Sequence, residues 1–324
     1  MMKLTMMRDL LESETHQNFI NSVLENWGYD QDSVRFIRAS SNFIYSFEHN
    51  SNKYILRLTP EKNINELENE ISFLNFLSEQ DVSVNAPIKS INGNTIEIIN
   101  DTLGIFYAVV FPYFEGKLYE IEELNNNQFV LWGEALGTLH KSSKKFSSIH
   151  NQEGTQSIKE LLNRLDRTLP LNEVEARNEF ELLRDWMEHL NQTELNYGRI
   201  HYDFELDNLI WADEKIQMID FEDGINCWYA ADIAFALRDL FENEVNLSNK
   251  SFQLFLKGYS KEMVITEQEV KEIPMFLRLH NLIMFGHLLE TIDIDSSTEN
   301  PQWVIGLKNK LILKIAQYRE GFKR

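Results

Sequence analysis

One run of polar residues with fixed spacing constrains this chain more than any other feature. Asp203 follows His201 by two positions, Asn208 follows Asp203 by five, and Asp220 comes twelve residues after Asn208. The surrounding residues form short β-rich segments at 199–201, 209–211 and 216–219. If the last two segments pair as a hairpin, the chain returns Asp220 to the side of Asn208. The sequence therefore predicts that Asp203, Asn208 and Asp220 face one cleft.

These residue types suit the transfer of a phosphoryl group. A hydroxyl that attacks a phosphate needs a carboxylate to orient it and accept its proton, and Asp203 can supply one. Sites that bind phosphates for transfer also bind Mg²⁺, and this ion prefers oxygen ligands. Asn208 offers a carbonyl oxygen and Asp220 a carboxylate. We therefore expect Asp203 to be catalytic and Asn208 and Asp220 to bind the metal.

The same spacing carries a resemblance to a known family. His-x-Asp-x-x-x-x-Asn followed by Asp-Phe is typical of the protein-kinase-like fold. The form at 200–210, Ile-His-Tyr-Asp-Phe-Glu-Leu-Asp-Asn-Leu-Ile, resembles the aminoglycoside phosphotransferase/choline kinase family. Further similar segments lie at 137–140, 219–223, 228–234 and 255–259, so the resemblance covers roughly residues 35–315. By this analogy His201 holds the loop and does not carry a proton.

The resemblance implies an α+β, bilobal protein-kinase-like fold, with a small β-rich N-terminal lobe and a larger, mainly helical C-terminal lobe. Hydrophobic periodicity agrees with it. Helical patterns occur at 8–27 and 63–79, and β-rich runs at 33–58, 86–100 and 104–113. Later helices are expected at 125–143, 156–167, 172–190, 228–242, 249–260, 267–290 and 301–320. We place the nucleotide-binding lobe at 1–112 and the catalytic and substrate lobe at 113–324.

In the N-terminal lobe, the resemblance implies a site for ATP or GTP. Arg57 stands where kinases carry a strand lysine that reaches the phosphates and pairs with a helix glutamate. Glu70 is the expected partner because it lies beside the apolar stripe of its helix, and Glu66, one turn earlier, is the alternative.

Two further segments are expected to contact the nucleotide. The hairpin that covers the phosphates would include Ser41 and Asn42, although it lacks the Gly-x-Gly-x-x-Gly of protein kinases. The base would lie near Phe111 and Tyr113, in an apolar and aromatic segment where the lobes join.

The acceptor should bind beside Asp203. Expected wall residues are Glu205, Asp223, Trp228 and the acidic segment 290–299. The net charge of −20 disfavours nucleic acid and is compatible with a cationic ligand. Together these features favour an amine-bearing alcohol of the aminoglycoside, choline or amino-sugar type.

Composition limits the cellular setting. Cys227 is the single cysteine, which excludes disulfides within the chain and fits a reducing, cytoplasmic location. The first residues lack the apolar region of a signal peptide, and the longest apolar run is too short for a membrane span. We expect no nucleic-acid or membrane partner, and either a monomer or a homodimer.

The leading interpretation is an ATP- and Mg²⁺-dependent phosphotransferase that acts on a hydroxyl of a small molecule. A protein Ser/Thr kinase ranks lower, because Tyr202 replaces the arginine of His-Arg-Asp and eleven residues separate Asp220 from Asp232, too few for an ordinary activation loop. A kinase-fold protein that binds nucleotide without efficient transfer is a further alternative, which Arg57 and the glycine-poor hairpin leave open.

Overall fold

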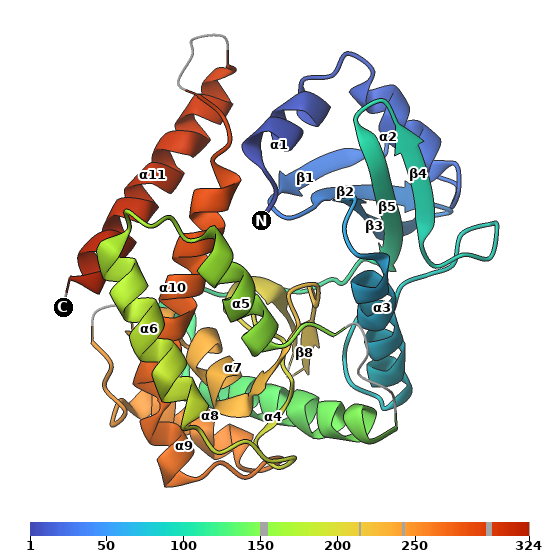
Figure 1. The fold of residues 1–324 in the computed structure, drawn as a ribbon. Helices are drawn as coiled ribbons and strands as arrows, with labels where there is room; N and C mark the ends of the chain where they lie inside the picture. Colours follow the sequence, from blue (N-terminus) through green and yellow to red (C-terminus); the bar gives the residue numbers. More distant parts are fainter. Residues whose placement is uncertain (150–154, 214, 242–243, 296–299, 324) are drawn as a thin grey trace.

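A five-stranded antiparallel sheet forms the framework of the N-terminal lobe in this computed structural model (Figure 1), which describes residues 1–149, 155–213, 215–241, 244–295 and 300–323. The strands are β1 (Arg35–Ala39), β2 (Phe43–His49), β3 (Asn52–Pro60), β4 (Glu97–Asp101) and β5 (Gly104–Pro112), in the order β1-β2-β3-β5-β4. β2 and β3 meet at a tight turn after His49, as the sequence predicts.

Helices cover both faces of this sheet. Alternation along β3 turns Leu56 and Leu58 toward α1 (Leu4–Leu11) and α2 (His16–Leu24), where they join one hydrophobic core. Arg57, between them, points to the opposite face, toward α3 (Ile64–Glu79). The sheet thus presents a charged side chain to α3 from within an apolar strand.

Helices dominate the C-terminal lobe. They are α4 (Asn126–Ile149), α5 (Ile158–Thr168), α6 (Val174–Glu188), α7 (Tyr229–Ala236), α8 (Lys250–Tyr259), α9 (Glu267–Lys271), α10 (Ile273–Thr291) and α11 (Gln302–Phe322), with short 3₁₀ turns at Ile121–Glu123, Leu206–Asn208 and Asp239–Phe241. Two small sheets lie among them, β6 (Tyr197–Arg199) with β9 (Asn226–Trp228) and β7 (Leu209–Ala212) with β8 (Lys215–Met218). This arrangement confirms the α+β, bilobal, protein-kinase-like fold.

Two glycines allow α4 and α8 to cross at close range beneath the small sheets. A Cβ on Gly133 would lie 1.9 Å from the Phe255 carbonyl oxygen, and one on Gly258 would lie 1.9 Å from that of Val130. Since real Cβ atoms never approach so closely, glycine at both positions sets the distance between the helices.

Four expected elements differ from the structure. The helix expected at 228–242 ends at Ala236 and is followed by the 3₁₀ turn, while residue 242 lies outside the described residues. The helix expected at 8–27 is two helices, because Ser13 Oγ bonds to Thr15 Oγ1 and accepts from the Thr15 backbone N–H between α1 and α2. The helix at 267–290 breaks after Lys271, and Pro274 lies in the first turn of α10. The segment 86–100 is strand only from Glu97 onward.

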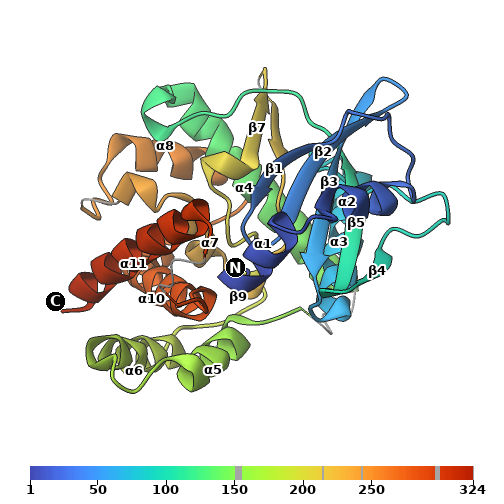
Figure 2. The same ribbon diagram turned by 90° about the horizontal axis from the view of Figure 1, so that it is seen from above.

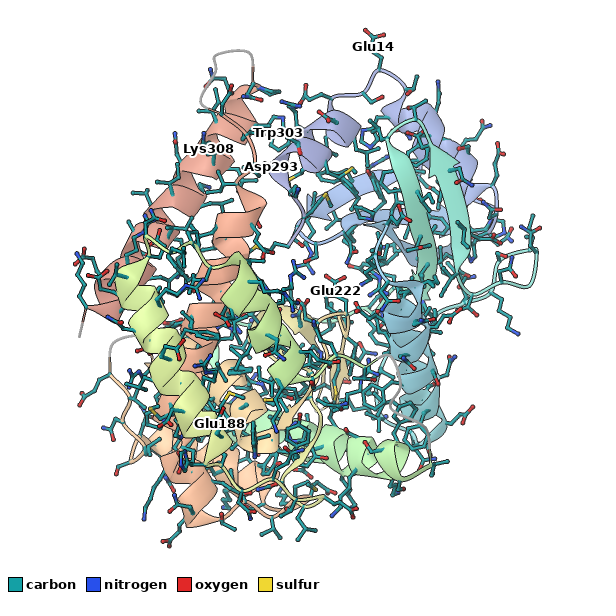
Figure 3. All side chains as sticks on the ribbon, viewed as in Figure 1. Glu14, Glu188, Glu222, Asp293, Trp303 and Lys308 are labelled. Atoms are coloured by element: carbon teal, nitrogen blue, oxygen red, sulfur yellow. The ribbon has the colours of Figure 1, made fainter. Side chains whose placement is uncertain are left out.

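The first and last helices meet across the lobes (Figure 2). The Thr5 backbone N–H donates to Asp293 Oδ1 at 3.0 Å, and Trp303 Nε1 donates to Glu12 Oε1 at 2.6 Å. Asp293 and Trp303 lie on the edge of the helical lobe that faces α1 (Figure 3). No helix in the described ranges is long and apolar enough to cross a membrane.

Candidate active site

The β7–β8 hairpin brings the three expected centre residues together. Met218 pairs with Leu209, and the Ile219 N–H donates to the Asn208 carbonyl at 3.1 Å, so Asp220 leaves the hairpin beside Asn208. Asn208 Nδ2 donates to Asp203 Oδ2 at 2.9 Å and to the Asp203 carbonyl at 2.9 Å. The prediction that these side chains share one site agrees with this geometry.

A buried carboxylate holds the loop that carries Asp203. Asp232 is fully buried and accepts hydrogen bonds from the backbone N–H groups of His201 (2.9 Å) and Tyr202 (2.8 Å). His140 Nε2 lies 2.9 Å from Asp232 Oδ2, and its Nδ1 lies 2.9 Å from the Tyr259 hydroxyl. This network fixes the backbone just before Asp203, although the sequence alone assigned it no role.

His201 is fully buried within the loop that it is expected to hold. Its Nε2 lies 3.0 Å from the Ile219 carbonyl, so it ties the loop to the strand before Asp220. Burial lowers the pKa of His201, against the opposing charges of Asp232 and Asp203. The ring is therefore neutral near pH 7 and does not face solvent.

Arg238 is a site residue that sequence reasoning missed. Its Nη1 donates to Asp203 Oδ1 at 3.2 Å, and its Nη2 pairs with Glu205 Oε2. Burial and the Asp203 charge raise the pKa of Glu205 to about 7, against the influence of Arg238. Glu205 thus contacts the arginine that holds Asp203. A single arginine after α7 gives no motif that could have revealed this contact.

Asp220 lies in strained backbone and carries an ion pair from the other lobe. Its φ of +66° is in the left-handed region, as is that of Tyr202 (+75°), and such residues cluster at functional sites. Arg38 Nη2, from β1, lies 2.8 Å from Asp220 Oδ2. Burial and the Glu222 charge raise the pKa of Asp220 to about 7, although Arg38 and Arg57 oppose the shift.

Arg57 and Glu70 form the buried pair expected from the sequence. Arg57 Nη1 and Nη2 donate to the two Glu70 oxygens at 2.7 and 2.8 Å, and the residues are 4% and 2% exposed. Burial alone would lower the pKa of Arg57, but Glu70 raises it well above its usual value. Glu66, the alternative partner, is exposed on α3.

An interlobe cavity of about 450 Å³ borders this centre through Tyr202 and Glu222, although Asp203, Asn208 and Asp220 are not among its lining residues. Ser41 and Asn42 line it from the β1–β2 turn, and Asp223 lines it from the segment after Asp220. Asn42 Nδ2 donates to Glu222 Oε2, and Lys62 Nζ lies 3.7 Å from the same oxygen. Glu222 is seen between the lobes in Figure 3.

Several other expected residues do not line this cavity, among them Arg57, Glu70 and Glu205. Trp228 is 3% exposed and donates from Nε1 to the Asn191 carbonyl at 3.0 Å, so its side chain belongs to the core of the helical lobe. Tyr113 lies against Lys53, 5.8 Å from Nζ to the ring centroid, in a separate surface depression. Phe111 is buried under the Arg57 guanidinium. Glu290 lines the cavity, whereas 296–299 lie outside the described residues.

The centre has the donor set that a divalent cation needs together with phosphate oxygens. Asn208 Oδ1 is buried and has no hydrogen-bond partner, although Nδ2 of the same amide has two. Asp220 supplies a carboxylate next to it. Within the described residues no cluster of three or more His, Cys, Asp or Glu could hold a metal alone. The residues fit a cation whose remaining ligands come from a nucleotide and water.

Comparison with known proteins gives consistent results. A model of the phosphotransferase enzyme family matches residues 33–261. The chain is 24% identical over 307 residues to amicoumacin kinase of Bacillus subtilis (strain 168), with 90% of each chain covered. It is 23% identical over 265 residues to homoserine kinase of Methylobacillus glycogenes, covering 79% of this chain and 80% of that one.

Two solved structures are similar in fold. Amicoumacin kinase hAmiN, in complex with AMP-PNP, Ca²⁺ and Ami, has a TM-score of 0.81 at 21% identity, covering 94% of this chain and 92% of that one. A microcompartment-associated aminopropanol kinase has a TM-score of 0.74 at 20% identity, covering 95% and 97%. The family model spans more than half of the sequence and agrees with the motif at 200–223, so the chain belongs to the phosphotransferase enzyme family.

Proposed function

We propose that this chain is an ATP- and Mg²⁺-dependent kinase that phosphorylates a hydroxyl group of a small, amine-bearing molecule. The observation that carries the proposal is the convergence of Asp203, Asn208 and Asp220 on one site, with Asn208 Oδ1 buried and unpaired. A nucleotide and a divalent cation accompany the similar hAmiN structure. The named relatives act on small molecules, which supports the same class of acceptor here.

Asp203 is the proposed catalytic residue. It would accept the proton of the acceptor hydroxyl while the hydroxyl oxygen bonds to the γ-phosphorus. The bond between that phosphorus and the β,γ-bridging oxygen breaks, and the nucleoside diphosphate leaves with the electron pair. Asn208 and Asp220 would hold Mg²⁺, which neutralises charge on the phosphates when it is bound. Arg238 keeps one Asp203 oxygen in place from the opposite side.

The N-terminal lobe would hold the nucleotide. Arg57, fixed in a bidentate pair by Glu70, directs a permanent positive charge toward the region of Asp220 and Glu222. Ser41 and Asn42 would cover the phosphates from the β1–β2 turn. Arg38 supplies a second cation there, and because its partner is the Asp220 carboxylate, metal binding has to displace or rearrange that pair.

The protein-kinase alternative is disfavoured by the short connection after Asp220. Residues 221–225 form a turn, β9 begins at Asn226 and α7 begins at Tyr229, so little chain is present to dock a peptide. The alternative of nucleotide binding without efficient transfer predicts that no acceptor stimulates ATP consumption.

The test is a screen of ATP consumption with aminoglycosides, choline, homoserine, amino alcohols and sugars as acceptors. We expect at least one amine-bearing alcohol to stimulate turnover, and Asp203→Ala to abolish the stimulated rate while nucleotide binding persists. If nucleotide binds but no acceptor stimulates turnover and Asp203→Ala changes nothing, the binding-only alternative is correct.

A further inference from the structure

The interlobe cavity carries charges of both signs. Its acidic lining residues are Glu61, Glu66, Glu222, Asp223 and Glu290, and its basic groups are Lys3, Lys62, Arg164, Arg199 and the amino terminus of Met1. A site for a purely cationic ligand would carry an excess of carboxylates. The near balance of charge therefore points to a ligand that itself carries both signs.

Most of these charges already have partners or face open solvent. Arg164 pairs with Glu290 at 2.6 Å, and Lys62 lies 3.7 Å from Glu222. Lys3, Glu61 and Glu66 are exposed at the rim. Arg199 is the buried exception, and Asp223 is exposed to the cavity without a bonded partner among the described residues.

Arg199 is a buried cation whose charge is poorly compensated. It is 3% exposed, and within the described ranges its guanidinium has one hydrogen bond, from Nη1 to the Asn69 carbonyl at 3.3 Å, and the face of the Phe73 ring at 4.7 Å. Its Nε has no partner. Both oxygens of Glu70 accept hydrogen bonds from Arg57, and no hydrogen bond or ion pair joins Glu70 to Arg199 within the described ranges.

The lack of a bonded counter-ion for Arg199 is reflected in the pKa of its guanidinium. Burial lowers the pKa of Arg199 to about 10, and the more distant Glu70 charge offsets this only in part. A buried charge without a bonded counter-ion is unfavourable. An anion delivered by a ligand would supply the missing partner and could bind in bidentate fashion.

Asp223 is the complementary group, because it lines the same cavity and its charge is felt together with that of Asp203. A Cβ on Gly224, the next residue, would lie 3.5 Å from Arg199 Nε, which places the guanidinium beside this segment. The Asp223 side chain is open to the cavity and has no hydrogen bond or ion pair with any described residue. Burial and the Glu222 charge raise the pKa of Asp223 to about 7, and Asp203 adds to the effect, although the amino terminus and Lys62 oppose it.

We propose that the acceptor is zwitterionic: a hydroxylated amino acid or similar compound whose carboxylate pairs with Arg199 and whose ammonium group pairs with Asp223, with its hydroxyl directed to Asp203. This inference rests on the proposed function and narrows its acceptor class. The carboxylate takes no part in the transfer; it positions the acceptor, and the bonds that form and break are those given above.

The test uses pairs of probes that differ only by the carboxylate. L-Threonine is compared with 1-aminopropan-2-ol, and L-homoserine with 3-aminopropan-1-ol. Calorimetry with the full chain, Mg²⁺ and a non-hydrolysable ATP analogue measures each Kd, and ADP release with ATP measures kcat/KM. We expect the carboxylated member of at least one pair to bind about 10- to 100-fold more tightly, as for a charge-assisted hydrogen bond.

Variants separate the two ends of the ligand. Arg199→Gln should remove the preference for the carboxylated member and leave the Kd of the amino alcohol unchanged, and Arg199→Lys should restore part of it. Asp223→Asn should weaken both members of a pair by the same factor. Arg164→Gln is the matched control, because this arginine lines the same cavity but is already paired with Glu290. In this variant the ratio of the Kd values of the two members of a pair should not change.

Each outcome decides the inference. If neither carboxylated probe binds, or if each binds no more tightly than its amino alcohol, the zwitterionic acceptor is excluded. Should an aminoglycoside or choline be phosphorylated in that case, the proposed function stands and only the acceptor class is wrong. Thermal melting shows whether Arg199→Gln is still folded. If the folded variant still binds the carboxylated probe more tightly than its amino alcohol, the role of Arg199 is also overturned.

Discussion

Removing Glu70 should destabilise the N-terminal lobe far more than removing a similar carboxylate on the surface. Glu70 receives two hydrogen bonds from Arg57, at 2.7 and 2.8 Å, and both residues are at most 4% exposed. Taking away one partner of such a buried pair leaves an uncompensated charge and costs about 3–5 kcal/mol. Glu70→Ala should lower the free energy of unfolding by that amount.

The control is another carboxylate paired with an arginine. Glu181 pairs with Arg184 on the surface, where the side chains are 54% and 47% exposed, so water replaces the lost partner and Glu181→Ala should cost less than about 1 kcal/mol. Urea unfolding followed by tryptophan fluorescence measures both variants. The double variant Arg57→Met/Glu70→Leu should recover much of the stability, since it removes both charges. A loss below about 1 kcal/mol for Glu70→Ala would refute the view that the pair is buried and strongly coupled.

Three further predictions concern catalysis, packing and pH. Arg238→Ala should lower kcat about 10- to 100-fold with little change in the Kd of the nucleotide, because Asp203 loses the contact that orients it. Gly133→Ala should lower the melting temperature sharply, whereas Gly306→Ala, which meets nothing within 4 Å in α11, should raise the free energy of unfolding by roughly 0.5–1 kcal/mol. The folded state raises the pKa of Glu205 from 4.5 to about 7. Its contribution to stability is therefore complete below 4.5 and is lost as the pH rises through about 7, and Glu205→Gln should remove that part of a pH–stability profile.

The sequence predicted the features that depend on local spacing. Asp203, Asn208 and Asp220 come together because a hairpin of fixed register joins two of them, and both the spacing and the β-rich flanks are visible in the sequence. The Arg57–Glu70 pair was also predictable, because strand alternation and the helical stripe turn both residues inward. In each case a periodic pattern decides which way the side chain points.

The features that were missed depend on contacts between distant segments. Arg238 reaches Asp203 across 35 positions, and no pattern distinguishes it from an arginine at a helix end. The aromatic side chain of Trp228 fits a pocket wall or a core equally well by sequence, and only the packing of the helical lobe decides that it is buried. Similarly, the break between α1 and α2 comes from local bonds of Ser13 and Thr15 that compete with a helix whose apolar periodicity continues across them.

The central claim is that Asp203 acts on the acceptor while Asp220 acts on the metal, and one comparison of variants tests it most directly. Mg²⁺-dependent binding of the ATP analogue and the acceptor-stimulated rate are measured for Asp203→Asn and Asp220→Asn. We expect Asp203→Asn to bind the nucleotide like the wild type and to lose about 10²–10⁴-fold in kcat. Asp220→Asn should lose the Mg²⁺ dependence of nucleotide binding itself. Wild-type turnover by Asp203→Asn, or unchanged Mg²⁺-dependent binding by Asp220→Asn, would contradict the assignment.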